Sequence, residues 1–207
     1  MSAASAPRSA PAAARNAAPI GQIAADWLAP LEGTLLEIGC GTGEHAATLS
    51  ALTPDLCWLP TDRDPDVETI LAWRERAEHP ERVAAPAVLD IDDSEQWQRF
   101  EQVAAVFTVN TLHIMNRDSV TRLFAGAAAA CRAGGLLFVY GPLHVRGKAT
   151  SPGNAAFDTQ LRGAGRDMGI RHLEAVRSEA AGQGWIERAH YAMPANNQAL
   201  VWQCGRR

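Results

Sequence analysis

The sequence predicts an α/β fold with a mostly parallel sheet of seven strands, helices on both faces and an antiparallel terminal strand. Three observations support this prediction. Apolar runs of strand length alternate with helical patterns, an order that implies parallel strands joined by helical crossovers. A glycine-rich turn at residues 39–43 follows the first apolar run. Two late β-like runs are separated by a short turn, which indicates an antiparallel hairpin.

The first half of the chain supplies four of the expected strands. Apolar residues recur at helical spacing over residues 19–28, and Pro30 and Gly33 end this helix. A buried strand then runs through Leu35 and Ile38 into the glycine turn. The same periodicity predicts helices at residues 45–52, 67–78 and 94–101, and strands at residues 56–60, 87–89 and 103–109.

The second half of the chain supplies the remaining three strands. Asp118 is expected to cap a helix through Cys131, whose Gly134-Gly135 exit leads into a strand at residues 136–140. Residues 141–165 are rich in glycine, proline and polar side chains, which predicts a loop with one helical insert. The last expected elements are a helix at residues 171–181 and strands at residues 185–193 and 198–203, joined through residues 194–197.

Composition bounds the class of protein. A chain of 207 residues that is 47% hydrophobic suits one domain, expected at residues 19–207. Residues 1–18 are almost all Ala, Ser and Pro with two arginines and no acid, which predicts a disordered tail. An organelle transit peptide shares that composition and stays open as an alternative.

Net charge, hydropathy and cysteine spacing limit the ligands and the cellular location that we expect. A net charge of -4 argues against a nucleic-acid substrate, and no apolar run approaches the roughly 18 residues that cross a bilayer. The four cysteines lack C-x-x-C spacing, so we expect reduced thiols, no metal and a cytoplasmic protein. Oligomeric state is left open.

The glycine turn is the strongest functional motif. Residues 35–45 read LLEIGCGTGEH, in which Gly39, Gly41 and Gly43 let the backbone turn sharply under a ligand, as in the nucleotide-binding turn of a Rossmann-like sheet. A dinucleotide fingerprint requires G-x-G-x-x-G, but Glu44 stands at the third glycine position. With Glu37, the pattern E-x-G-x-G-x-G resembles motif I of class I S-adenosylmethionine (SAM) dependent methyltransferases.

Residues at the carboxyl ends of the strands extend the predicted cofactor site, because ligands of open α/β sheets bind there. Asp62, about 20 residues beyond the glycine turn, is placed to accept both ribose hydroxyls. Asp90 and Ile91 resemble an adenine site, with a carboxylate for the exocyclic amine and an apolar cover for the ring. Asp92 and Asp93 could equally cap the next helix, so a shift of two residues in the expected strand end would change this assignment. Asn110 and Leu112, after the fourth strand, complete the expected cofactor contacts.

Several motifs together resemble one family. They are Arg15-Asn16 with Pro19-Ile20, the E-I-G-C-G-T-G-E-H turn, W-L-P-T-D at 58–62, N-T-L-H-I at 110–114, G-G-L-L-F-V-Y-G-P at 134–142, Asn154 with Phe157-Asp158, and M-P-A-N-N at 193–197. The chain is similar to the methyltransferase-like family catalogued as domain of unknown function 938. This resemblance covers nearly the whole chain after about residue 15, and implies a class I fold and use of SAM, but no methyl acceptor. Cys40 departs from it, since a small Ala or Ser is expected there.

Candidates for catalysis and acceptor binding follow the later strands. His113 at a strand end has an ordinary pKa in the range useful for a general base. It could instead hydrogen-bond the cofactor or pack against the following helix. Tyr140, His144 and Asp158 are weaker candidates for lining the acceptor pocket.

Two further groups have both a functional and a structural interpretation. Asn196 and Asn197 could bind a polar acceptor, although asparagine is also favoured by tight turns. Arg162, Arg166 and Arg171 could pair with a carboxylate or phosphate on the methyl acceptor, or belong to a solvated loop.

We therefore expect a SAM-dependent methyltransferase that acts on a small molecule. Two alternatives stay open. One is a non-catalytic SAM-binding protein that positions a partner, and the other is an NAD-dependent oxidoreductase, which Glu44 disfavours.

Overall fold

The computed structural model describes residues 7–164 and 167–205, which divide into two compact units, Met1–Leu89 and Asp90–Arg207. Each unit is described by itself. Both consist of parallel strands connected through helices, and the second also contains an antiparallel hairpin. The predicted Rossmann-like α/β fold class is confirmed. That residues 19–207 form one domain stays a prediction.

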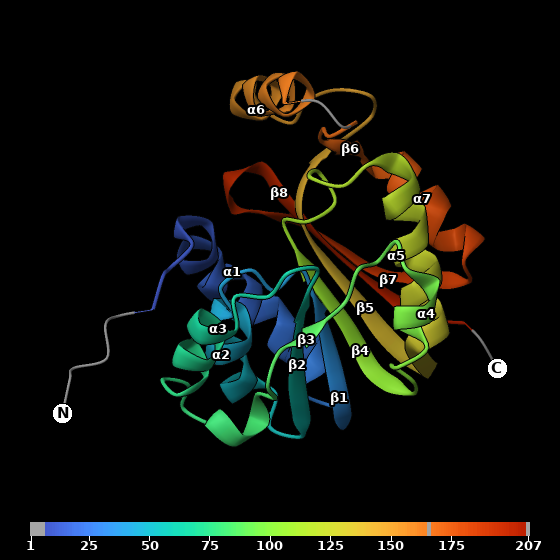
Figure 1. The fold of residues 1–207 in the computed structure, drawn as a ribbon. Helices are drawn as coiled ribbons and strands as arrows, with labels where there is room; N and C mark the ends of the chain where they lie inside the picture. The colour runs from blue at the N-terminus through green and yellow to red at the C-terminus, as the bar shows by residue number, and fades with distance from the viewer. Residues whose placement is uncertain (1–6, 165–166, 206–207) are drawn as a thin grey trace. The chain divides into compact units, whose positions relative to one another are not determined.

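The first unit contains a parallel group of strands in the order β3-β2-β1 (Figure 1). Strand β1 (Gly33–Ile38) pairs with β2 (Leu56–Asp62), and β2 pairs with the short β3 (Ala87–Val88). The helices are α1 (Pro11–Leu28), α2 (Glu44–Leu49), α3 (Val67–Arg74) and the 3-10 turns Ser50–Leu52 and Pro80–Arg82. The elements therefore match the predicted ones, with α3 ending four residues earlier than expected.

Helix α1 corrects the prediction of a disordered segment at residues 1–18. The helix begins at Pro11 rather than Pro19, so residues 11–18 are helical, while residues 1–6 lie outside the described part of the chain. Alanine has the highest helix propensity, and proline is tolerated in the first turn, where its missing N–H is not needed. Ala13, Ile20 and Ala24 form a buried stripe, and α1 packs against α2. Tertiary packing thus stabilises a segment whose composition alone indicated disorder.

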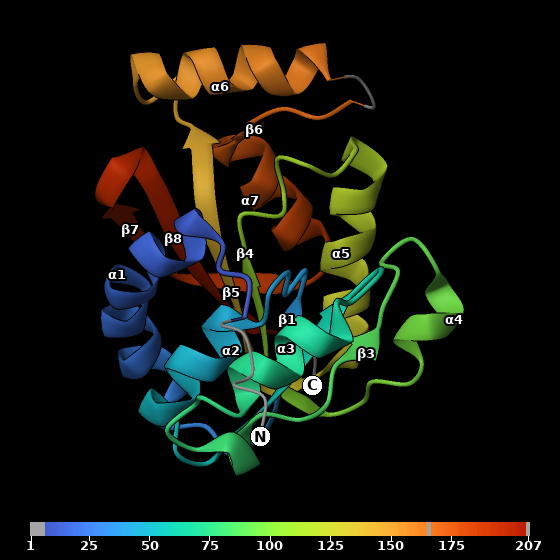
Figure 2. The ribbon, with the colours of Figure 1, turned by 60° about the vertical axis from the view of Figure 1, so that its left-hand side comes forward.

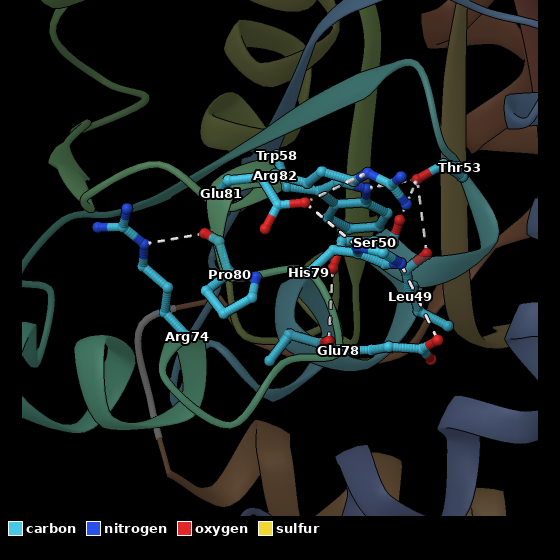
Figure 3. Close-up of polar contacts among 11 residues, drawn as sticks. Leu49, Ser50, Thr53, Trp58, Arg74, Glu78, His79, Pro80, Glu81 and Arg82 are labelled. Carbon is cyan, nitrogen blue, oxygen red and sulfur yellow. Dashed lines mark hydrogen bonds and ion pairs between the residues drawn. The ribbon is translucent and has the colours of Figure 1, made fainter.

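The indole of Trp58 anchors the middle of β2. This side chain is fully buried, and its Nε1–H donates to Thr53 Oγ1 at 2.8 Å (Figure 3). The same figure shows Arg74 Nε donating to the carbonyl of Pro80 at 3.1 Å, which fixes the end of α3 to the following 3-10 turn. A buried polar group without such a partner would cost free energy. These contacts hold the connection that returns the chain to β3.

The second unit has the strand order β4-β5-β8-β7, with β6 paired to β5. Strands β4 (Val103–Val109), β5 (Cys131–His144) and β6 (Arg171–His172) are parallel, whereas β7 (Trp185–Met193) and β8 (Asn197–Cys204) form the predicted antiparallel hairpin. The helices are α4 (Ser94–Trp97), α5 (Arg117–Ala130), α6 (Pro152–Gly163) and α7 (Leu173–Gly182). Figures 1 and 2 show α6 beyond the carboxyl end of β5, next to β6.

Several details of the second unit differ from the sequence prediction. Helix α4 ends at Trp97 instead of residue 101, and β5 begins at Cys131 instead of residue 136. Helix α5 is capped by Asn116, whose side chain accepts the Ser119 N–H at 2.8 Å, so Asp118 lies in the first turn and is not the cap. Strand β5 continues four residues past Tyr140 into the predicted loop. There it pairs with β6, which adds an eighth strand among the described residues and delays the start of α7 to Leu173.

None of the helices within the described ranges is both long and apolar enough to span a membrane.

Candidate functional site

The glycine turn reverses the chain between β1 and α2. Gly39, Gly41 and Gly43 have φ values of 68°, 54° and 78°, in the left-handed region that favours glycine. A Cβ on Gly43 would lie 2.9 Å from the side chain of Ile70, so packing requires this glycine. A Cβ on Gly41 would meet no atom within 4 Å. The space over Gly41 is therefore free of protein atoms and offers room for a ligand.

Asp62 lies at the end of β2, beside this turn. Its Oδ2 accepts the N–H of Gly41 at 3.0 Å, and its Oδ1 accepts the N–H of Arg63 at 2.8 Å. The structure thus brings together Asp62 and Gly41, which are 21 residues apart in the chain. Its role toward a ribose stays a prediction.

Glu37 is a buried acid beneath the turn. Burial, followed by the charge of Asp62, raises the pKa of Glu37 to about 8, and burial lowers the pKa of His45 to about 4. At pH 7 both side chains are therefore mainly neutral, and the 3.8 Å approach of His45 Nδ1 to Glu37 Oε1 is not an ion pair. Within the described residues, Glu37 Oε2 has no hydrogen-bond partner. Such an unsatisfied buried oxygen is costly and indicates a place for a ligand donor or water.

Glu44 anchors the segment before α1. This residue occupies the position of the third glycine in a dinucleotide fingerprint. It is buried at the start of α2, and its Oε2 accepts the hydroxyl of Ser9 at 2.9 Å and the N–H of Ala10 at 3.3 Å. Trp73 Nε1 donates to the carbonyl of Arg8 at 2.8 Å. Residues 8–10 are thereby fixed to α2 and α3. No local sequence signal indicates these contacts, because their partners are more than 30 residues apart.

In the second unit, Asp90 and Ile91 open the connection to α4. Asp90 Oδ1 accepts the N–H of Asp92 at 3.0 Å, and the carbonyl of Ile91 accepts Trp97 Nε1 at 3.0 Å. Asp93 is the helix cap, since its Oδ1 accepts the N–H groups of the first turn of α4. Asp93 and not Asp90 therefore caps α4. The assignment of Asp90 and Ile91 to the adenine ring stays a prediction.

Asn110, directly after β4, and Asn197, at the start of β8, both contact Tyr140 of β5. Asn110 has a left-handed φ of 59°, which is uncommon for a residue other than glycine, and its N–H donates to the carbonyl of Tyr140 at 2.8 Å. Asn197 Nδ2 donates to Tyr140 Oη at 3.1 Å. Burial raises the pKa of Tyr140, so its phenol stays protonated. Asn196 has a φ of 59° in the turn between β7 and β8, in agreement with the structural interpretation of this residue.

Leu112 and His113 are held by Arg171 of β6 and by Gly169, which lies before β6. Arg171 Nε donates to the carbonyl of Leu112 at 3.1 Å, and the N–H of Gly169 donates to the carbonyl of His113 at 2.9 Å. The buried imidazole of His113 lies edge-on to Phe157 of α6, with ring centroids 5.3 Å apart. Burial and then the charge of Arg171 lower the pKa of His113 to about 4. The imidazole is therefore neutral at pH 7 and can accept a proton only weakly.

Asp158 joins α6 to the rest of the second unit. Its Oδ1 accepts the N–H of Ile170 at 2.7 Å, and its Oδ2 lies 2.8 Å from Arg162 Nε and 3.3 Å from His144 Nε2. Burial opposes ionisation, but the hydrogen bonds from Arg162, Ile170 and His144 together lower the pKa of Asp158. These contacts favour a structural role over the predicted acceptor contact. In the described ranges, no group of three or more His, Cys, Asp or Glu side chains could hold a metal ion.

Comparison with known proteins identifies a family and a fold. A model of the family described as "Protein of unknown function (DUF938)" matches residues 7–204. An O-methyltransferase family protein from Burkholderia thailandensis has a TM-score of 0.78 at 15% identity, over 93% of this chain and 57% of that one. An O-methyltransferase family 2 protein from Planctomyces limnophilus, in complex with apigenin, has a TM-score of 0.76 at 20% identity, over 93% and 59%.

Human N-acetylserotonin methyltransferase, in complex with SAM, has a TM-score of 0.74 at 13% identity, over 94% of this chain and 53% of that one. The chain thus spans somewhat more than half the length of each of these three proteins. At these identities the similarity establishes the class I methyltransferase fold and nothing about the reaction.

Proposed function

We propose that this chain, which belongs to the DUF938 family, is a SAM-dependent methyltransferase that acts on a small molecule. The observation that carries the proposal is the glycine turn, where open space over Gly41 lies beside the carboxylate of Asp62. The class I methyltransferase fold of the chain supports it.

The residues around the turn fit SAM better than a dinucleotide. SAM carries a positive sulfonium and an amino acid group, whereas NAD carries two negative phosphates. Glu37 offers a buried oxygen without a described partner, and Asp62 offers a second carboxylate. The carboxylate of Asp62 would repel a pyrophosphate, and the neutral carboxyl group of Glu37 can accept a hydrogen bond through its unpartnered oxygen. We propose that Gly39, Gly41 and Gly43 lie against the cofactor, with Asp62 holding the ribose hydroxyls and Glu37 the positive end.

The remaining predicted residues are proposed for the adenine ring and the acceptor. Asp90 and Ile91 would bind the adenine, and Asn110 and Leu112 would complete the cofactor contacts. When bound, SAM supplies an electrophilic methyl group for an in-line displacement. The protein then has to orient the acceptor and exclude water.

The polar groups at the ends of β4 and β5 suit an acceptor with a hydroxyl or amine. Tyr140 and Asn197 would orient it, and the neutral imidazole of His113 would accept its hydrogen bond. Because the pKa of His113 is about 4, this imidazole would serve as a full proton acceptor only if the bound acceptor raised its basicity. Apigenin, which is bound to one neighbour, and N-acetylserotonin, which is in the name of another, are small molecules with an aromatic hydroxyl, which supports the hydroxyl class of acceptor.

Calorimetry and turnover test the proposal in two stages. We expect saturable binding of SAM and of S-adenosylhomocysteine, and no binding of NAD. Turnover of methyl-labelled SAM with a metabolite extract should then transfer label to a small molecule. Binding without transfer would favour the non-catalytic alternative, and preference for NAD would overturn the cofactor assignment.

A further inference from the structure

The second unit contains a cavity of about 360 Å³ among α5, α6, β6 and α7. Helix α7 follows β6 directly and packs against α5 (Figure 2). Three arginines line the cavity: Arg117 from α5, Arg162 from α6 and Arg171 from β6. Ligand pockets occupy roughly 300 to 1,000 Å³, so this volume suits one small molecule. None of the residues proposed above for the cofactor or the acceptor lines it.

Arg171 places a positive charge in this cavity without a carboxylate beside it. Its guanidinium donates to the carbonyls of Leu112, Met115 and Asp167, all of which are neutral acceptors. Among the described residues, no carboxylate oxygen lies within 4.0 Å of this guanidinium. Burial lowers the pKa of Arg171; the charge of Asp167 opposes this, Arg117 and Arg162 add to it, and Asp158 has a smaller opposing effect. Arginine stays charged at neutral pH in any case, so a half-buried charge remains without a paired anion.

A second arginine of the cavity also has no ion-pair partner among the described residues. The guanidinium of Arg117 forms no hydrogen bond or ion pair with any described residue, whereas Arg162 is paired with Asp158. Two carboxylates line the cavity, Asp118 and Glu179, and Glu179 Oε2 already accepts the hydroxyl of Thr121 at 3.0 Å. Among the described residues, Arg117 and Arg171 are thus the two lining guanidinium groups without a carboxylate oxygen within 4.0 Å, although Asp118 and Glu179 also line the cavity.

We propose that this cavity binds a small organic oxyanion, a carboxylate or a phosphate ester, whose charged group is held by Arg117 and Arg171. Guanidinium groups bind both oxyanions through paired N–H donors. Val120, Ile170 and Val176 form an apolar part of the wall, so the rest of the ligand should be apolar. Because Arg171 also holds the carbonyls of Leu112 and Met115, the ligand would bind one side chain away from the segment that carries His113. This proposal does not depend on the reaction proposed above.

Titrations followed by two-dimensional NMR test the site with four probes. Phenyl phosphate and benzoate carry the two anionic groups on similar rings, benzyl alcohol is a neutral analogue, and inorganic phosphate lacks the ring. We expect saturable shifts with phenyl phosphate or benzoate on residues of α5 and α7. The stronger of these two ligands identifies the class of oxyanion. Benzyl alcohol should bind at least tenfold more weakly, because it cannot form charge-assisted hydrogen bonds.

Variants of α5 separate the site from general charge effects. Arg117→Gln should weaken binding of the better probe about tenfold, Arg117→Lys should weaken it less, and Arg117→Glu should abolish it. Arg122→Gln is the matched control, because it removes the same charge from the same helix but does not line the cavity. Spectra of each variant report whether it is folded. No saturable binding, equal binding of benzyl alcohol, or equal loss in Arg117→Gln and Arg122→Gln would overturn the proposal.

Discussion

The glycine turn of the first unit and the strand-end residues of the second unit differ in how their polar groups are used. At the turn, Glu37 has a buried oxygen without a described partner, and the space over Gly41 is open. At the strand ends, the Tyr140 hydroxyl already accepts from Asn197, and the His113 ring packs against Phe157. The first region has the features of a preformed ligand site. In the second region Tyr140 and His113 are engaged in contacts within the protein, although the buried Nδ1 of His144, at the end of β5, also has no described hydrogen-bond partner. The geometry therefore supports the cofactor assignment at the turn more strongly than the acceptor assignment at Tyr140 and His113.

The largest expected effect comes from filling the space over Gly41. Gly41→Val should reduce SAM affinity at least 100-fold, because a branched side chain would occupy that space, and calorimetry measures the loss. Gly147→Val is the matched control, since Gly147 also has a left-handed φ, 73°, and a Cβ added there would meet no atom within 4 Å, but it lies in the second unit. Both variants should lose similar stability through backbone strain. Equal SAM affinity in the two variants would contradict the proposal that SAM binds over Gly41.

The buried acid predicts a pH dependence of stability. The pKa of Glu37 is raised from 4.5 to about 8, so the native state binds this proton more tightly than the unfolded state. Stability contributed by protonated Glu37 is complete below pH 4.5 and is lost as the pH rises to about 8. Glu37→Gln should therefore be more stable than the wild type at pH 8.5 by a few kcal/mol, at about 1.4 kcal/mol per pKa unit.

Urea unfolding at pH 5 and pH 8.5 measures this difference. At pH 5 the variant and the wild type should be nearly equal. Glu75→Gln, at an exposed position after α3, provides the control and should show little change between the two pH values. A Glu37→Gln advantage that did not grow with pH would show that the acid is already ionised in the native state.

The smallest effect is expected from the strand-end contacts. Tyr140→Phe removes the acceptor of one hydrogen bond, and Asn197 Nδ2 keeps its second acceptor, the carbonyl of Pro194 at 3.2 Å. The variant should lose only about 1 kcal/mol of unfolding free energy in urea, with SAM affinity unchanged. A large fall in SAM affinity would mean that Tyr140 belongs with the cofactor residues.

Local patterns in the sequence were sufficient to predict most helices and strands and the glycine turn. Periodicity located β4 and the hairpin of β7 and β8, because these depend on neighbouring residues. It failed at residues 11–18, where packing of α1 against α2 outweighs composition. It also failed beyond Tyr140, where pairing with the distant β6 extends β5.

In the candidate site, too, the residues that follow from local spacing could be predicted from the sequence. Asp62 follows from its distance to the glycine turn, a spacing set by α2, the 3-10 turn Ser50–Leu52 and β2. The contacts of Glu44 and Arg171 could not be predicted from the sequence, because each contact joins segments that only the tertiary structure brings together. Arg166, which the sequence groups with Arg162 and Arg171, lies outside the described residues. Cytoplasmic location and the small-molecule acceptor stay predictions.

The attachment of residues 8–10 to α2 and α3 bears on how the chain can be shortened. Pro11 begins the first helix, and so looks like a natural place to trim the protein. Removal of the preceding residues would delete the two donors of the buried Glu44 carboxylate and the carbonyl that accepts Trp73 Nε1. A buried acceptor left unsatisfied costs about 1–3 kcal/mol. The boundary that preserves the neighbourhood of the glycine turn therefore lies ahead of Arg8, outside every regular element.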